Sequence, residues 1–358
     1  MNDIKQQLKE TLGNINKSSS NKNHIVLKLK TLTPLYTGGI GQQGDQIHPS
    51  NLLGGIRHFS CLVAKFLGEK DFETEVWGTA EESEPKAKQI ALKWDTSELK
   101  PINFHNKQIK INNNKGWYFS SAFEGELTLQ ITKQFTKCDK NIKEQFEKYW
   151  NILLISIAIQ IRHAMFGSKD QFGLGVLDLV NPEDFKKFPK LNIPLNEVKD
   201  DFLDKENKLM NLKRYAFATV TFRKASVNTF VNFKNETKLK LGLAIRYNLR
   251  NALRPDDSQK WKEIRHKMFG ELNKYSSGVN ISAAYGNEEN PKIRVTIELK
   301  LDNKEDRAEV VKKIQEKLKN IEFIENIGYR IDNVIWKFGS AQKNENKVDW
   351  LNKLAGVL

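Results

Sequence analysis

The chain has 358 residues, with 58 lysines and arginines against 44 aspartates and glutamates, a formal net charge of +14. Hydrophobic residues make up 39% of it, which is enough to build cores and excludes a wholly disordered protein. The two cysteines, Cys61 and Cys138, provide neither a disulfide framework nor a zinc-ligand set, and they suit a reducing cytosol. We therefore expect a cytoplasmic protein of about two domains with a polyanionic partner, of which nucleic acid is the commonest.

Apolar patterns predict the order of elements in the first half. Strand-like alternation covers 24–35 and recurs at 127–131. A helix that opens at Pro49-Ser50-Asn51 is expected over 52–67, and a second one over 142–161, because apolar residues recur there at helical spacing. A glycine-punctuated loop, 166–176, then leads into a short strand. This strand-helix-strand-strand-helix-strand order is the split βαβ of a ferredoxin-like domain.

The same order recurs in the second half. Predicted strands cover 216–224, 279–285, 292–301 and 334–338, and predicted helices cover 238–253 and 310–321. Three prolines and many charges make 181–212 typical of a linker. We predict an α+β protein with two ferredoxin-like domains of βαββαβ type in tandem. Its parts are a polar lead-in at 1–23, a first domain at 24–180, the linker at 181–212, and a second domain at 213–358 with a C-terminal helical extension.

A short sequence echo links the two halves. Gly55-Ile56-Arg57-His58 matches Ala244-Ile245-Arg246-Tyr247, and at nearly the same distance downstream Trp77-Gly78 matches Phe269-Gly270. Both pairs fall at the same place in the predicted order, so the echo favours a duplication.

Two motifs of the first half resemble the RAMP proteins of type III CRISPR effectors. They read Thr33-Pro34-Leu35-Tyr36-Thr37-Gly38-Gly39 and, after a short loop, His48-Pro49-Ser50-Asn51-Leu52-Leu53-Gly54-Gly55-Ile56-Arg57. They are similar to the opening of the first subunit of the type III-B (Cmr) complex, and the Gly167–Gly175 loop is similar to the glycine-rich loop of that family. The resemblance covers roughly 24–301 and departs from the family at His48, where arginine is frequent.

The resemblance implies a non-catalytic, RNA-binding subunit of a CRISPR ribonucleoprotein in antiviral defence. Its partners would be the guide RNA near its 3′ end, the complementary target RNA and other RAMP subunits, with no cofactor and no metal. The residues expected to bind RNA are Ser50, Asn51, Arg57, His58, Lys169, Arg246, Arg250 and Lys274, with Ser50 as the N-cap of its helix. The glycines expected to shape the nearby loops are Gly38, Gly39, Gly54, Gly55, Gly167, Gly173 and Gly175.

Plainer interpretations of these residues stay open. Ser50 could serve only as a helix cap, and Arg57 could pair with a carboxylate. The glycines of the 167–175 loop could mark a tight helix-to-strand connection that needs positive φ angles.

Other functions also stay open. Related RAMP subunits cut target RNA with a metal-dependent aspartate in the loop after the first strand, where Asp45 lies here, so a metal-dependent endoribonuclease is one alternative. A second alternative uses His48 or His58 as the general base of an RNA-processing enzyme. A third is an assembly scaffold without direct RNA contact.

Overall fold

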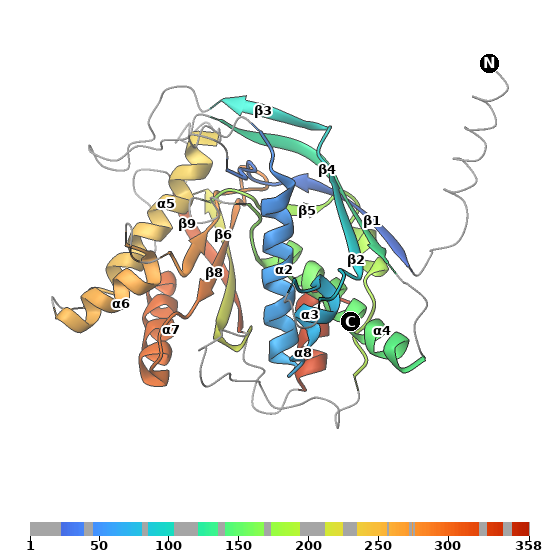
Figure 1. Cartoon of the computed structure of the whole chain (residues 1–358). Helices are drawn as coiled ribbons and strands as arrows, with labels where there is room; N and C mark the ends of the chain where they lie inside the picture. Colours follow the sequence, from blue (N-terminus) through green and yellow to red (C-terminus); the bar gives the residue numbers. More distant parts are fainter. Residues whose placement is uncertain are drawn as a thin grey trace, which may run out of the picture.

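The chain forms two antiparallel sheets with helices packed against them (Figure 1). This computed structural model describes residues 23–38, 46–80, 85–103, 121–134, 140–167, 173–193, 212–224, 235–255, 258–271, 274, 276–321, 328–338 and 346–357. The elements of the first half are β1 (His24–Thr31), α2 (Pro49–Phe66), α3 (Phe72–Trp77), β2 (Ile90–Asp95), β3 (Leu99–Asn103), β4 (Ser121–Lys133), α4 (Lys140–His163), β5 (Leu177–Leu179) and the 3-10 helix η3 (Pro182–Lys187). Those that follow are η5 (Leu212–Arg214), β6 (Tyr215–Lys224), α5 (Asn235–Ala252), α6 (Gln259–Phe269), β7 (Val279–Ile281), β8 (Lys292–Glu298), α7 (Lys304–Lys319), β9 (Tyr329–Phe338) and α8 (Lys347–Ala355).

The first sheet has the strand order β2-β4-β1-β5, and β3 pairs with β4 beyond β2. The predicted alternation in β1 is confirmed, since Leu27 and Leu29 are fully buried and lie opposite Leu129 and Leu127 of β4. Burying these side chains removes apolar surface from water, which is the main driving force for the sheet to pack on helices. The same core contains the apolar faces of α2 and α4.

The second sheet has the order β7-β8-β6-β9, and helices α5, α6 and α7 cover one of its faces (Figure 1). Side chains of β6 alternate between two cores: Ala216 and Ala218 pack with these helices, whereas Phe217 packs in the core of the first half. β6 is therefore buried on both faces, whereas β9 at the edge of the sheet has exposed side chains such as Ile335. The two sheets share a strand order. In the first, β1 lies between β4 and β5, which are connected through α4. In the second, β6 lies between β8 and β9, which are connected through α7.

The sequence echo corresponds to equivalent places in the two halves. Arg57 lies on α2 and Arg246 on α5, and the following short helices, α3 and α6, both end at a glycine. Gly78 has φ 78° and ψ 168°, and Gly270 has φ 85° and ψ 152°. These angles are accessible to glycine and strained for other residues, so both halves use the same type of helix stop.

Some predicted bounds are wrong in detail. The strand predicted to reach Tyr285 ends at Ile281, and the one predicted to reach Leu301 ends at Glu298. The sequence patterns did not identify α6. Within the predicted linker, η3 is followed by Phe188 and Leu191, which are buried in the first core.

Arg294 of β8 joins the second sheet to the end of α4. This side chain is only 6% exposed, and its Nη1 donates hydrogen bonds to the carbonyl oxygens of Ile161, Ala164 and Leu177 at 2.5, 3.2 and 3.4 Å. Its guanidinium also lies 5.6 Å from the ring centre of Tyr285. The last carbonyls of a helix lack partners within the helix and carry partial negative charge, so a buried cation is well placed there.

The C-terminal helix α8 packs on the first half although it follows the second sheet in the chain. His163 Nε2 lies 2.9 Å from the carbonyl oxygen of Leu354, and the imidazole ring lies 5.6 Å from that of Phe217. The side chain of Asn352 bonds both the N–H and the carbonyl oxygen of Leu191, at 2.8 and 2.9 Å. Residues distant in the sequence therefore hold α8 against the first core.

Replacing Arg294 with methionine should destabilise the protein, because three helix-end and strand carbonyls would no longer have a charged donor. Hydrogen bonds to charged groups contribute about 1.5–3 kcal/mol each, so we expect the free energy of unfolding in urea to fall by at least about 2 kcal/mol. The control is Arg223→Met in β6, because Arg223 is 57% exposed and lies 3.9 Å from Asp332. Equal effects of the two substitutions would contradict the role given to Arg294.

Acid should loosen the contact of α8 with α4. Burial lowers the pKa of His163, the charges of Arg294 and Lys337 act in the same direction, the bond to Leu354 opposes them, and the resulting pKa is about 3. Between about pH 3 and the ordinary pKa of about 6.5, His163 is protonated in the unfolded chain and neutral in the folded chain. The free energy of unfolding is therefore highest above this range and decreases as the pH falls through it. We expect the melting temperature to drop between about pH 7 and about pH 5, and to drop less in His163→Gln. A drop of the same size in the variant would contradict this assignment.

Candidate nucleic-acid interface

The start of α2 is tied to the end of the first motif. Thr37 is buried, and its hydroxyl accepts a hydrogen bond of 2.7 Å from the backbone N–H of His48. The side-chain amide of Asn51 donates to the carbonyl oxygen of Thr37. The residues before and after the intervening loop are thereby held together, and Asn51, predicted to bind RNA, has a structural role here.

The prediction that Ser50 caps this helix is wrong. His48 occupies the N-cap with extended backbone angles and makes no capping side-chain bond, and Pro49 follows as the first helical residue. Proline suits that position because its missing N–H would have no partner there in any case. Ser50 consequently lies inside the first turn, where it is exposed.

The exposed face of α2 collects several of the predicted residues. Ser50, Asn51, Gly54, Arg57 and His58 are all exposed and recur at the helical period. Arg57 is bound to a carboxylate, as the plainer interpretation has it: its Nε and Nη2 donate to Glu73 Oε1 at 3.1 and 2.9 Å. About half of each side chain is exposed, and such pairs are weak and easily exchanged for another anion.

Backbone angles and close contacts explain why Gly167, Gly173 and Gly175 are glycines. Gly167, Gly173 and Gly175 have φ angles of 94°, 90° and 87°. A Cβ on Gly175 would lie 1.8 Å from the carbonyl oxygen of Phe166, and one on Gly173 would lie 2.5 Å from the backbone nitrogen of Ala283 in the second half. These three glycines are thus positions where backbone passes close to backbone, and Gly173 lies against Ala283, two residues after β7. Gly38 also has a positive φ, and Gly39, Asp45 and Lys169 lie outside the described residues.

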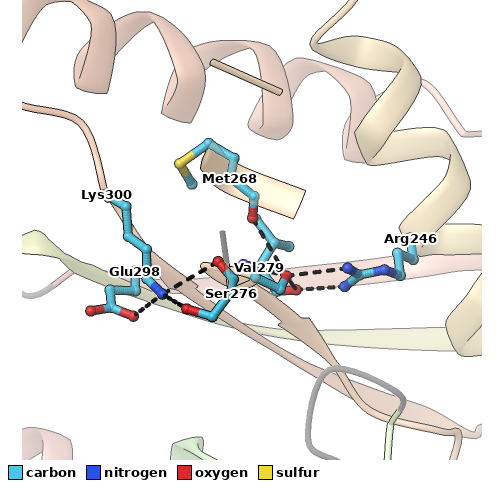
Figure 2. A network of polar contacts seen from close by, with 7 residues as sticks. Arg246, Met268, Ser276, Val279, Glu298 and Lys300 are labelled. Carbon is cyan, nitrogen blue, oxygen red and sulfur yellow. Dashed lines mark hydrogen bonds and ion pairs between the residues drawn. The ribbon is translucent and has the colours of Figure 1, made fainter. Parts of the chain in front are cut away.

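Arg246 holds the beginning of β7. Its guanidinium donates to the carbonyl oxygen of Val279 at 2.6 Å (Figure 2). It also donates to the carbonyl oxygen of Phe269 at 2.9 Å and to the hydroxyl of Ser277 at 3.2 Å. From the other side, Lys300 donates to the hydroxyl of Ser276 at 2.8 Å and lies 3.3 Å from Glu298. Arg246 was predicted to bind RNA, but its guanidinium already donates hydrogen bonds to backbone carbonyl oxygens. Lys274, also predicted, lies 3.6 Å from Glu271 and is largely exposed.

A cationic patch lies where α5 faces α6. Arg250 is exposed and lies within electrostatic reach of Arg265, since burial together with the charge of Arg265 lowers the pKa of Arg250. Within the described part of the chain, neither arginine has a carboxylate partner, and Arg265 Nε is buried without a hydrogen bond. Tyr247, one turn before Arg250, is 54% exposed. Sequence reasoning found Arg250 but missed Arg265, which is near it only because two helices meet.

Three other predicted residues meet at a cavity between the two halves. Gly55 and His58 of α2 and Gly167 line one side of it, together with Gln160 near the end of α4. Tyr215, Asn280 and Glu298 of the second sheet line the other side, and the volume is about 170 Å³. No sequence pattern pointed to Gln160, which is 3% exposed and lies within an apolar helix stripe.

Two negative findings apply to the ranges given above. Among the described side chains, His, Cys, Asp and Glu nowhere form a group of three that could hold a metal ion. No described helix combines the length and the apolar character that a membrane span requires.

Comparison with known proteins finds similarity to one family in the first half of the chain. Residues 28–178 match the model of the RAMP superfamily. Curated proteins give no match. Among solved structures, the apo crystal structure of Cmr1 from Pyrococcus furiosus is similar, with 12% identity over 93% of this chain and 96% of that chain and a TM-score of 0.39. Chains of two cryo-EM structures of Type III-B Cmr-beta are also similar, each over 82% of this chain and 99% of that chain. The structure bound to cognate target RNA has 13% identity and a TM-score of 0.48. The structure bound to cognate target RNA and AMPPnP, in the presence of ssDNA, has 12% identity and a TM-score of 0.45. The match to the RAMP superfamily therefore covers residues 28–178, less than half of the chain, and includes both motifs that resemble this family.

Proposed function

We propose that the chain is a non-catalytic RNA-binding subunit of a Cmr-like type III-B CRISPR ribonucleoprotein that acts in the cytoplasm in antiviral defence. It would hold guide RNA, target RNA or both beside other RAMP subunits. The RAMP match over 28–178 and the net charge of +14 support this proposal. The shared strand order of the two sheets supports the further proposal that both halves are ferredoxin-like units.

The observation that carries RNA binding is the pair of arginines between α5 and α6. Two guanidinium groups within electrostatic reach of each other repel, and in the described part of the chain no carboxylate offsets that repulsion at Arg250 and Arg265. A phosphate between them would do so and would accept several charge-assisted hydrogen bonds. The exposed ring of Tyr247 adds a surface on which a base can stack.

Binding of this kind reads the backbone rather than the sequence. Phosphate contacts release counterions, so the affinity for single-stranded RNA should fall with salt, with a log–log slope of about −0.7 per phosphate neutralised. Sequence selection is then left mainly to base pairing with the guide. The alternative of an endoribonuclease at Asp45 makes a different prediction, namely that RNA is cut in the presence of magnesium.

The test replaces both arginines, Arg250→Gln and Arg265→Gln, and measures RNA binding over a range of salt concentrations. We expect weaker binding and a salt slope that is shallower by about 0.7 for each phosphate that the variant no longer neutralises. The control, Lys312→Gln with Lys319→Gln, removes the same charge from α7, where Lys312 lies 3.9 Å from Glu316 and Lys319 is exposed.

Equally weakened binding in the two double variants would show that net charge alone binds RNA and would contradict the role of this patch. A salt-independent interaction would contradict phosphate binding altogether. RNA recovered from the same mixtures should be intact, and cleavage abolished by Asp45→Ala would establish the nuclease instead.

A further inference from the structure

We infer that the cavity between the two halves binds one unstacked cytosine base of the RNA. The inference rests on the proposed RNA-binding function and extends it to a specific subsite. Its basis is the combination of aromatic walls, buried acceptors and a volume that suits one ring.

The walls of the cavity are aromatic on both sides of the junction. Phe59 of α2 and Tyr215 of β6 both line it, with their ring centres 6.4 Å apart and their planes at 78°. His58 also lines the cavity and is exposed, so the imidazole lies where the cavity opens to solvent. Unstacked bases in protein–RNA complexes are commonly held against such rings.

The polar groups in the cavity include acceptors that need donors. Gln160 is 3% exposed, and its Oε1 has no hydrogen-bond partner among the described residues, although most buried polar atoms have one. Glu298 lines the same cavity, and its carboxylate forms an ion pair with Lys300. A carboxylate offers about four acceptor positions, so it retains capacity for a ligand. A ligand that presents N–H groups would satisfy both residues.

The size of the cavity favours a single ring. Its volume is about 170 Å³, and apolar cavities of about 150 Å³ accept benzene. Of the two pyrimidines, cytosine carries an amino group at the position where uracil carries a carbonyl oxygen. The amino group of cytosine can donate one hydrogen bond to Gln160 Oε1 and one to Glu298, whereas uracil presents a carbonyl oxygen at that position and has only its N3–H to donate, so at least one of the two acceptors would stay unpaired.

The cavity is formed in advance of any ligand. Arg246 and Lys300 hold the segment that begins β7 from its two sides, and this segment supplies Gly278 and Asn280 to the wall (Figure 2). On the opposite wall, Gly55 lies next to the amide of Gln160, since a Cβ there would lie in van der Waals contact with Gln160 Nε2, at 3.4 Å. A pre-organised site of this kind loses little freedom when a base enters.

The test compares short oligocytidylate with oligouridylate of equal length, at neutral pH and constant salt, by fluorescence anisotropy. The intact chain should bind oligocytidylate about five- to tenfold more tightly, the range expected for pairing one or two buried acceptors. Gln160→Leu, which keeps the volume and removes the acceptor, should bring the ratio of the two affinities to about one. Thermal melting checks that each variant is folded.

Two adjacent glycines provide a matched pair of further variants. Gly55→Val fills the cavity and should also abolish the preference, whereas Gly54→Val has the same helix propensity but points into open space and should keep the ratio. Salt-dependent RNA binding with equal affinity for both oligomers, or a ratio unchanged in Gln160→Leu, would overturn this inference and leave the proposed function standing. Absence of any RNA binding would overturn the proposed function itself.

Discussion

The structure depends on one buried cation at the end of one helix. Arg294 reaches from the middle of the second sheet to carbonyl oxygens at the end of α4 and in β5. Removing such a charge from water is costly, and the partial negative charge of the helix end is what makes the position tolerable. Because Arg294 and Phe217 both point toward the first half, the second sheet lies with one face on α5 to α7 and the other on α4. The cavity is the part of this junction that side chains leave unfilled.

Several residues that sequence reasoning assigned to RNA binding or to the loops beside it take part in the framework of the fold. Arg246 holds the start of β7, Gly173 and Gly175 allow the chain to pass close to other backbone, and Asn51 closes the loop before α2. These roles explain why arginine and glycine recur at such places without requiring a ligand. Arg57, Arg250 and His58 differ, because they are exposed on helix faces and remain accessible to a partner.

The order of elements could be predicted from the sequence because it depends on local periodicity. Leu27 and Leu29 alternate because one face of β1 is buried, and the apolar stripe of α4 follows from its place between a sheet and other helices. The N-cap of α2 could not be predicted in this way. Ser50 is a residue type that favours the N-cap, but Pro49 favours the first helical position, which makes His48 the N-cap. Gln160, Arg265 and Arg294 could not be predicted for another reason: each takes its role from a neighbour far away in the chain, and no short-range pattern records that neighbour.

Beyond phosphate binding at the arginine patch of α5 and α6, the central claim is that an RNA base enters the cavity where the two halves join. The most direct measurement is ultraviolet crosslinking of a cytosine-containing RNA to the intact chain, followed by mass spectrometry of the modified peptides. Photoreactive bases attach to the side chains they touch, so we predict adducts at His58 or Phe59 and at Tyr215. Adducts confined to other peptides, such as those of β2 or of α7, would contradict the claim.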